Sequence, residues 1–195
     1  MPGSANYLLR PPVPDDAPGY VDAVLESIPA LAPWMPWAHE EYSMAEALSW
    51  IGWCRQGWEE RSRFAFSVFD AGSGAFVGGC GLNQINDVHR FCNLGYWVRQ
   101  SFQRRGVATE AIRALSAFAF TELSMGRVEI TVAVGNAASL GAARKAGAVH
   151  EGVARNRLKQ GDRFIDAHML SLVPPAHAQG DPENAVQPRA PAPRG

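Results

Sequence analysis

The chain has few cysteines and no excess of charge of either sign. Its 195 residues include three cysteines, Cys54, Cys80 and Cys92, an odd number widely spaced in apolar surroundings. This usage excludes a disulfide framework and predicts buried free thiols in a reducing compartment. The formal net charge of -1 gives no global basic field, which argues against bulk binding of nucleic acid.

Long apolar runs and metal-ligand motifs are also missing. No apolar run approaches the length that crosses a bilayer, and the N-terminal MPGSANYLLRPPVPDD lacks the apolar core of a signal peptide. We therefore expect a cytoplasmic protein with no membrane partner. The five histidines form no H-E-x-x-H helix and do not pair with the cysteines at ligand spacing, so we expect no metal.

The length and composition fit one folded domain and a tail. With 195 residues, of which 47% are hydrophobic, the chain can bury one substantial core. Two full domains would be crowded in this length. From Pro174 onwards the sequence is rich in proline, alanine and polar residues and offers almost nothing to bury. We expect a domain over residues 1–173 and a disordered tail over 174–195. An ordered arm on a neighbouring subunit is the alternative for the tail.

Residue patterns predict seven strands and four helices. Alternation, β-branched composition and turn residues predict strands at 7–10, 64–70, 75–85, 91–99, 127–134, 148–157 and 163–173. Apolar residues at the helical period predict helices at about 15–27, 43–54, 106–123 and 137–146. The expected caps are Asp15 or Asp16, Ser43 with Glu46, and Asn136, while Gly147 ends the last helix. The run 127–134 has the composition of a strand buried on both faces.

The segment 103–109 carries the clearest chemical signal, because there a strand runs into a loop and the loop opens a helix. The first amides of a helix have no internal partner, and the helix dipole adds roughly half a positive charge, so an anion binds there. Gly106 lets the backbone approach a phosphate, and the small Ala108 avoids a clash. Arg104 and Arg105 could decorate a solvated loop, but their position favours contact with phosphate. A pyrophosphate fits this junction.

This segment resembles the acetyl-CoA signature of the GNAT superfamily of N-acetyltransferases, which reads Gln or Arg, two variable residues, Gly, one variable residue, then Gly or Ala. The matching residues are Gln103, Gly106 and Ala108. Further features are similar to the RimJ/RimL branch: the tryptophan loop 33–37, Gly95-Tyr96-Trp97-Val98, Arg127-Val128-Glu129-Ile130, Asn136-x-x-Ser139 and Glu151-Gly152. The likeness spans about residues 7–173.

The resemblance implies a GNAT acyl-CoA N-acyltransferase fold of the α/β (α+β) class, with a mixed, mostly antiparallel twisted sheet of about seven strands flanked by four helices. It implies transfer of an acetyl group from acetyl-CoA to a primary amine, foremost the α-amine of a protein N-terminus, by a monomer or homodimer. A small amine such as a polyamine or aminoglycoside is an alternative acceptor. A non-catalytic acyl-CoA-binding module is a second alternative. A Rossmann-type oxidoreductase fits poorly, because the strands form a hairpin meander and no G-x-G-x-x-G is present.

The resemblance also assigns roles to residues. The strand before the loop pairs with pantetheine through its main chain, which assigns Tyr96, Trp97 and Val98 to the thioester. The residues assigned to the diphosphate are Gln103, Arg104, Arg105, Gly106, Val107, Ala108 and Thr109. Asn136 is placed beside the pantetheine, and Ser139 matches the serine that protonates the departing thiolate. Both have a helix-cap or first-turn interpretation as well. A thiol of pKa about 8.5 is already a fair leaving group, so the expected contribution of Ser139 is modest.

The general base and the acceptor pocket stay open. The ribosomal enzymes of the branch carry a glutamate seven residues beyond the Glu of the Glu-Gly pair, but here that position is Leu158, which cannot accept a proton. Glu129, Glu151, a residue of 39–41, or water could serve instead. A weak base favours α-amines, which are roughly 10 to 15% neutral at pH 7, over lysine side chains at about 0.04%. Trp34 and Trp37 either wall the acceptor pocket or plug the core.

Overall fold

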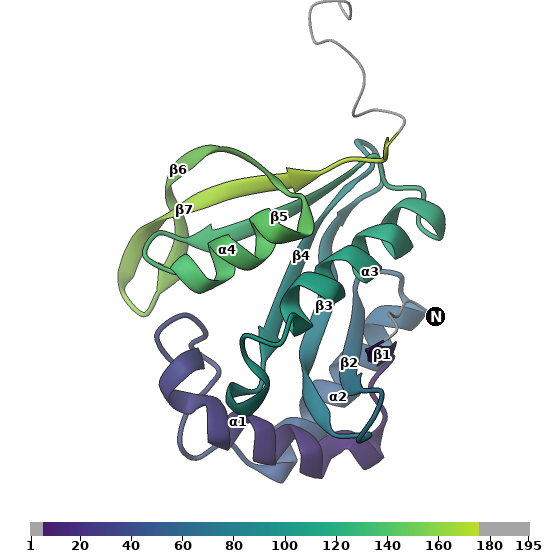
Figure 1. The fold of residues 1–195 in the computed structure, drawn as a ribbon, viewed down its shortest axis with the longest axis vertical. Coiled ribbons are helices and arrows are strands. Elements are labelled where there is room, and N and C mark those ends of the chain that lie inside the picture. Colours follow the sequence, from purple (N-terminus) through teal and green to yellow (C-terminus); the bar gives the residue numbers. More distant parts are fainter. Residues whose placement is uncertain (1–5, 176–195) are drawn as a thin grey trace, which may run out of the picture.

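A seven-stranded sheet runs through the middle of the molecule (Figure 1). The computed structural model describes residues 6–175. The strands are β1 (Tyr7–Arg10), β2 (Phe64–Asp70), β3 (Phe76–Asn86), β4 (Phe91–Val98), β5 (Arg127–Ala133), β6 (Val149–Gln160) and β7 (Arg163–Leu172). They lie in the order β1-β2-β3-β4-β5-β7-β6, and every neighbouring pair is antiparallel except β4 and β5. The predicted mixed, mostly antiparallel sheet is confirmed.

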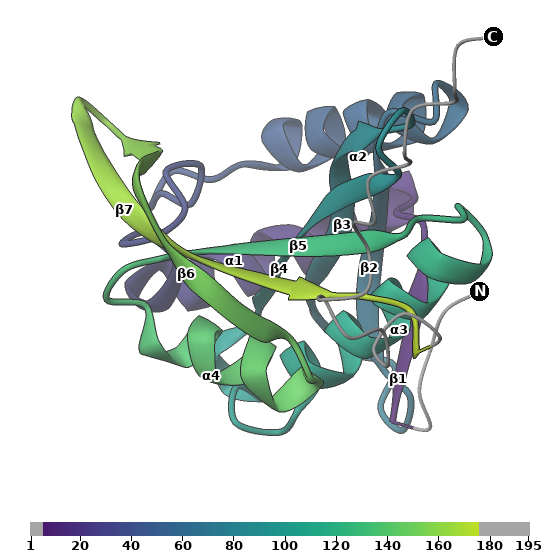
Figure 2. The same cartoon turned by 90° about the horizontal axis from the view of Figure 1, so that it is seen from above.

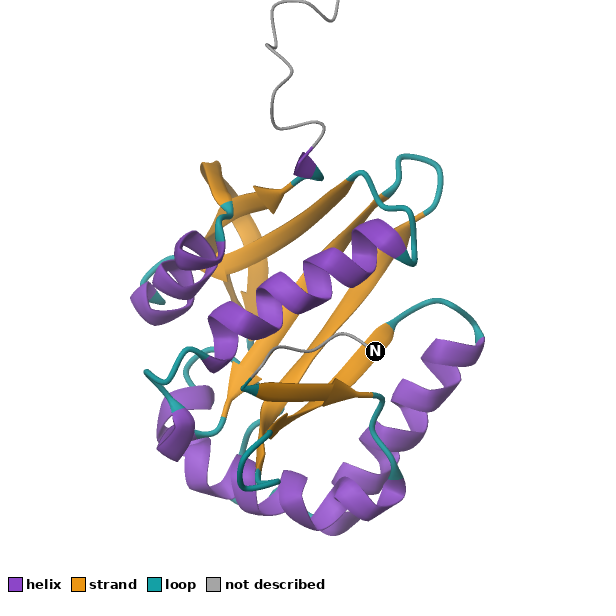
Figure 3. Cartoon of the chain, turned by 45° about the vertical axis from the view of Figure 1, so that its right-hand side comes forward, coloured by secondary structure: helices purple, strands orange, loops and turns teal. Residues whose placement is uncertain are grey.

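Four α-helices cover the sheet. They are α1 (Ala17–Leu31), α2 (Met44–Glu59), α3 (Val107–Thr121) and α4 (Ala137–Ala146), joined by the short 3-10 helices η1 (Pro14–Asp16) and η2 (Gln100–Phe102). Figure 2 shows α2 on one face of the sheet and α3 and α4 on the other. Figure 3 shows α3 lying across the strands. One core packs Ile112 and Leu115 of α3 against the sheet, and a second packs Val24 of α1 and Ile51 of α2 near Phe76.

Helix ends follow the local signals in the sequence. The Ser43 backbone N-H donates to Glu46 Oε2 at 2.9 Å, and the Glu46 N-H reaches Ser43 Oγ at 3.4 Å, which completes the predicted capping box. Asn136 Oδ1 accepts the Ser139 N-H at 3.0 Å. Gly147 ends α4 at φ +106°, a left-handed conformation that glycine adopts without penalty. These three predictions are confirmed.

The start and end of α1 correct the sequence prediction. Asp16 does not cap the helix, because its carboxylate accepts two hydrogen bonds from the Arg10 guanidinium at 2.8 and 2.5 Å. The helix also runs to Leu31 rather than Ser27 and contains Pro29. The ion pair with Arg10 of β1 therefore overrides the capping preference of this aspartate.

The strand β5 is buried on one face rather than on both. Val128, Ile130 and Val132 are buried in the core that α3 shares, whereas Arg127 and Glu129 are partly exposed. The β-branched composition is thus that of an alternating strand with one covered face.

The β4–β5 junction is paired along only part of its length. The parallel register places Phe91–Asn93 opposite Arg127–Glu129, and no further pair within residues 6–175 extends it. Figure 1 shows the two strands diverging toward the end where α3 begins. The pairing of β4 with β5 therefore ends at Asn93, and we call the unpaired stretch of this junction the β4–β5 gap.

The remaining predictions concern the thiols, membrane-spanning helices, metal sites and the C-terminal tail. The three cysteines are free and buried, and burial raises the pKa of each thiol to about 12. No helix within residues 6–175 has the length and apolarity needed to cross a membrane. Within the same residues, no group of three or more His, Cys, Asp or Glu side chains is arranged to hold a metal ion. Apart from Pro174 and Pro175, the predicted tail lies outside the described residues.

Candidate active site

The open half of β4 presents a free strand edge. Beyond Asn93, residues 94–98 keep their antiparallel register with β3 but have none with β5. Tyr96, Trp97 and Val98, the residues expected at a thioester, all lie in this half. An unpaired edge offers backbone N-H and C=O groups to an extended ligand, which can add to the sheet like a further strand.

The start of α3 lies beside this edge and presents backbone amides. Gly106 is the N-cap at φ +88°, and since glycine has no side chain it provides no side-chain cap. Val107 and Thr109 are buried, so their side chains pack within the protein. The Tyr7 hydroxyl donates to the Arg105 carbonyl at 3.0 Å, which ties the loop to β1. Uncapped amides at the positive end of a helix dipole form a site for an anion such as a phosphate.

The loop before α3 carries exposed polar side chains. Gln103, Arg104 and Arg105 are exposed, and Arg104 adopts φ +63°. The Arg105 guanidinium lies 4.8 Å from the centroid of the Phe102 ring. Ala108 is partly exposed in the first turn of α3, where its small side chain leaves space. Arg104 and Arg105 thus occupy the two positions before the N-cap of α3, where guanidinium groups can add charge-assisted contacts to an anion.

The hydroxyl groups of Tyr96 on β4 and Ser139 on α4 contact each other. The Tyr96 hydroxyl lies 2.8 Å from Ser139 Oγ and donates to the Ser139 carbonyl at 2.9 Å. Burial raises the pKa of Tyr96, so its phenol stays protonated near neutral pH. Asn136 holds the first turn of α4 in place through the Ser139 N-H. The sequence analysis assigned only the Tyr96 main chain, because no local signal shows that its side chain reaches a helix 43 residues later.

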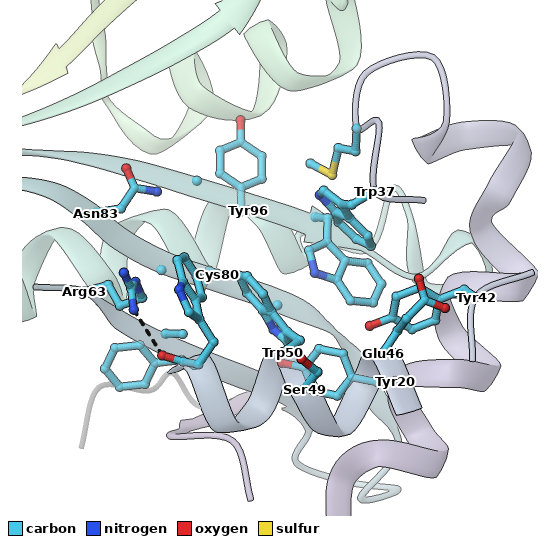
Figure 4. Close-up of a pocket in the computed structure, with 18 of the residues that line it drawn as sticks. Tyr20, Trp37, Tyr42, Glu46, Ser49, Trp50, Arg63, Cys80, Asn83 and Tyr96 are labelled. Carbon is cyan, nitrogen blue, oxygen red and sulfur yellow. Dashed lines mark hydrogen bonds between the residues drawn. The ribbon is translucent and has the colours of Figure 1, made fainter. Parts of the chain in front are cut away.

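A cavity of about 780 Å³ lies between α2, the α1–α2 loop and strands β3 and β4 (Figure 4). We call it the aromatic cavity. Its aromatic lining residues are Tyr20, Trp37, Tyr42, Trp50, Trp53, Phe66, Tyr96 and Trp97. Glycines 79, 81 and 95 form part of its floor. Since Gly95, Tyr96 and Trp97 belong to the open half of β4, the cavity and the gap share one strand segment.

The two predicted acceptor tryptophans occupy different places. Trp37 lines the aromatic cavity, and its ring centroid is 5.8 Å from that of Trp97. Trp34 is not part of the lining and lies instead beside the turn between β5 and α4. There its Cη2 would be 3.5 Å from a β-carbon placed on Gly135. Trp34 therefore does not line the aromatic cavity, and its assignment to the acceptor site stays a prediction.

The glutamates proposed as bases lie at the paired end of the sheet. Arg127 donates to Glu129 and Glu151 at 2.8 Å each, and Ser171 donates to Glu151 at 2.6 Å. The hydrogen bond from Arg127 holds the pKa of Glu151 at about 2, which makes this carboxylate a poor proton acceptor. Neither glutamate lines the aromatic cavity.

Of the other candidates for the base, His39 lies at the cavity. Its Nε2 is 2.9 Å from Glu46 Oε1, and both residues line the cavity, whereas Glu40 and Glu41 do not. Hydrogen bonds from Ser43, together with His39, lower the pKa of Glu46. Leu158 lies on β6 opposite Ile165, where it offers no titratable group. Of the candidate bases named from the sequence, His39 is thus the one that lines the aromatic cavity.

Comparison with known proteins agrees with this geometry. A family model described as an acetyltransferase (GNAT) domain matches residues 6–149. The chain is 31% identical to the "Putative ribosomal N-acetyltransferase YdaF" of Bacillus subtilis (strain 168), over 82% of this chain and 87% of that protein. It superposes with a TM-score of 0.78 and 29% identity on the structure of a "putative ribosomal-protein-serine acetyltransferase" from Vibrio cholerae, over 88% and 95% of the two chains.

A more distant structure shares the fold. RimL, whose structure is titled as a ribosomal L7/L12 α-N-protein acetyltransferase in complex with coenzyme A, superposes with a TM-score of 0.80 at 21% identity, over 89% of this chain and 97% of that chain. The family match covers more than half of the chain and includes the strand edge, the α3 start and α4. The chain therefore belongs to the acetyltransferase (GNAT) domain family and is an acetyl-CoA-dependent N-acetyltransferase.

Proposed function

We propose that this enzyme acetylates the α-amine of a protein N-terminus, with acetyl-CoA in the β4–β5 gap and the acceptor in the aromatic cavity. One observation carries the proposal: the gap and the cavity meet at the same three residues, Gly95, Tyr96 and Trp97. A donor and an acceptor bound at these two places would meet at one strand. Such positioning converts a bimolecular step into an effectively unimolecular one. We assign the activity to the domain over residues 1–173.

The residues around the gap fit coenzyme A as follows. The amides at the start of α3, with Gln103, Arg104 and Arg105, would hold the diphosphate. The free edge at Tyr96–Val98 would pair with the pantetheine arm, and Asn136 would lie beside it. Bound acetyl-CoA supplies an activated acyl group. A backbone N-H of the open half of β4 would donate to the thioester oxygen, and the Tyr96–Ser139 hydroxyl pair would return a proton to the departing sulfur.

The polar groups of the cavity support an α-amine as the nucleophile. An α-amine is roughly 10 to 15% neutral at pH 7, so it needs little help from a base. The His39–Glu46 pair, or water, can accept its proton. Among the described residues that line the cavity, Glu46 is the one carboxylate, and it already binds Ser43 and His39. A polyamine or an aminoglycoside carries several positive charges and would leave most of them unpaired there.

The names of the relatives support a protein acceptor, since the Bacillus protein and the Vibrio structure are both named for ribosomal substrates. We also propose a cytoplasmic location. Support for it comes from the three free, buried cysteines, which are typical of a reducing compartment.

Mass spectrometry tests the proposed function. Purified enzyme and acetyl-CoA are added to a lysate of a strain that lacks the gene, and new acetyl groups are mapped on proteins and small amines. We expect acetylation at protein N-termini that depends on the added enzyme. Acetylation confined to lysine side chains or to small amines would contradict the protein N-terminus as the acceptor.

A further inference from the structure

The aromatic cavity is much larger than a small N-terminal residue needs. Its volume of about 780 Å³ lies within the range of roughly 300 to 1,000 Å³ that holds drug-sized ligands. A β-carbon on Gly95 would meet no atom within 4 Å, so the floor of the cavity is open at the strand where the amine reacts. A seryl or alanyl side chain would leave most of this volume filled with water.

The wall that α2 contributes consists of aromatic rings held in place. The Arg63 guanidinium carbon lies 3.3 Å from the Trp53 ring centroid, and Arg63 Nη1 donates to the Trp53 carbonyl at 3.1 Å. The Trp50 and Trp53 ring centroids are 5.0 Å apart. Rings fixed in this way contact a ligand at a low cost in conformational entropy.

The opposite side of the cavity is aromatic as well. The Trp97 ring lies 5.8 Å from Trp37 and 6.1 Å from Tyr20, measured between centroids. Gly79 permits this arrangement, because a β-carbon there would come within 2.8 Å of the Trp97 indole nitrogen. Figure 4 shows Trp50 on α2 and Trp37 on the α1–α2 loop, with the cavity extending past Cys80 toward Asn83.

The charged groups of the lining already have partners within the protein, whereas much of its aromatic surface is exposed. Glu46 binds Ser43 and His39, while Arg63 stacks on Trp53. By contrast, Trp37, Trp50 and Trp53 are 42%, 41% and 46% exposed. Large aromatic side chains exposed side by side in a concave site are typical of a binding surface for an apolar group.

We infer that the preferred acceptor is an N-terminus whose first side chain is large and apolar or aromatic, and that this side chain fills the aromatic cavity while the amine lies at Gly95–Trp97. The inference rests on the proposed function and specifies its substrate class. Each methylene placed in an apolar pocket changes kcat/KM by roughly 10- to 200-fold. An N-terminal phenylalanine is therefore acetylated with a kcat/KM at least about tenfold above that of serine.

A set of peptides that differ only in the first residue tests the inference. Phenylalanine, leucine, alanine and serine peptides are compared by the rate of CoA release, with phenethylamine as a small aromatic amine. The expected order is phenylalanine and leucine above alanine and serine. An equal or reversed order overturns the inference and leaves the proposed function intact. If phenethylamine is acetylated but none of the four peptides is, the proposal of a protein N-terminus as the acceptor is overturned, whereas the preference for an aromatic acceptor is supported. No acetylation of any amine overturns both.

Two variants of α2 test the wall itself. Trp50→Ala should lower kcat/KM for the phenylalanine peptide about tenfold and that for the serine peptide by a clearly smaller factor. Leu48→Ala is the matched control, since Leu48 is 44% exposed on the same helix but does not line the cavity, and it should change neither value. An equal loss for both peptides in Trp50→Ala would show that the indole only supports the fold, which overturns the inference.

Discussion

The two halves of the β4–β5 junction differ in whether the protein itself satisfies the polar groups of the strand. In the paired half, Phe91–Asn93 lie in register with β5, and Arg127 pairs with both Glu129 and Glu151. In the open half, residues 94–98 have no register with β5, and Gly106, the N-cap of α3, has no side chain to cap the helix. Polar groups are thus satisfied within the protein in one half and available to a ligand in the other.

This difference assigns functions to residues that look alike in the sequence. Glu129 and Glu151 are carboxylates in the sheet, yet they lie in the paired half and bind Arg127. Tyr96 and Ser139 are hydroxyl residues on two separate elements, and they meet across the open half. Substitutions in the open half should therefore change cofactor binding and turnover, whereas substitutions in the paired half should change only stability.

The largest effect is expected at the start of α3. Gly106→Ala should raise the Kd for acetyl-CoA at least about tenfold, because a β-carbon at φ +88° strains the turn that presents the amides. Isothermal titration calorimetry measures this Kd. Gly147→Ala is the matched control, since Gly147 has a similar φ of +106° at the far end of α4. Similar losses of affinity in both variants would show that the effect is general destabilisation.

A smaller effect is expected at the hydroxyl pair. Ser139→Ala and Tyr96→Phe should each lower kcat about two- to tenfold without changing the KM for acetyl-CoA, because the thiolate is a fair leaving group without an acid. The two hydroxyls contact each other at 2.8 Å, so the double variant should lose little more than either single variant. Steady-state kinetics on all three variants checks this. Losses that multiply in the double variant would mean that the two groups act independently.

Loss of the Asn136 cap of α4 should mainly lower the stability of the fold. Asn136→Ala should lower the free energy of unfolding by about 1 kcal/mol, because the Ser139 N-H loses its acceptor. Asn136→Asp should restore most of this loss, since a carboxylate accepts the same hydrogen bond. Thermal and denaturant unfolding measure both. If Asn136→Asp recovers stability but binds acetyl-CoA more weakly, the Asn136 amide also contacts the cofactor.

The smallest effect is expected in the paired half. The pKa of Glu151 is about 2 when folded and 4.5 ordinarily, so its contribution to stability is present above about pH 4.5 and is lost as the pH falls toward 2. Glu151→Gln should flatten the pH dependence of stability in that window, and the change should be modest because the pair is partly exposed. It should leave kcat/KM unchanged. A large loss of activity in Glu151→Gln would place this carboxylate in catalysis.

Local features of the sequence were enough to predict most of the strands and three of the helix ends. Ser43, Asn136 and Gly147 act on amides or carbonyls within four residues of themselves, so their roles follow from spacing alone. Asp16 was predicted as a cap in the same way and instead pairs with Arg10 of β1. The prediction was wrong there because a partly buried ion pair with another element outweighs a local cap.

The cavity could not be predicted in the same way. Its walls come from α1, the α1–α2 loop, α2, β2, β3 and β4, and no periodicity relates Trp50 on α2 to Trp97 on β4. The tryptophan loop was recognised, but only Trp37 of its two tryptophans lines the cavity. Which of two adjacent rings faces a pocket depends on how the loop packs against the sheet.

The sequence by itself determined the strand-loop-helix junction around Gly106, because a glycine at a helix start controls its own backbone and the amides next to it. Only the tertiary structure decided that Tyr96 meets Ser139 and that Trp37, Trp50 and Trp97 enclose one space. Contacts of this kind depend on where β4 parts from β5 and on how α2 lies over the sheet. The positions of these strands and of α2 are set by the packing of the whole core rather than by neighbours in the chain.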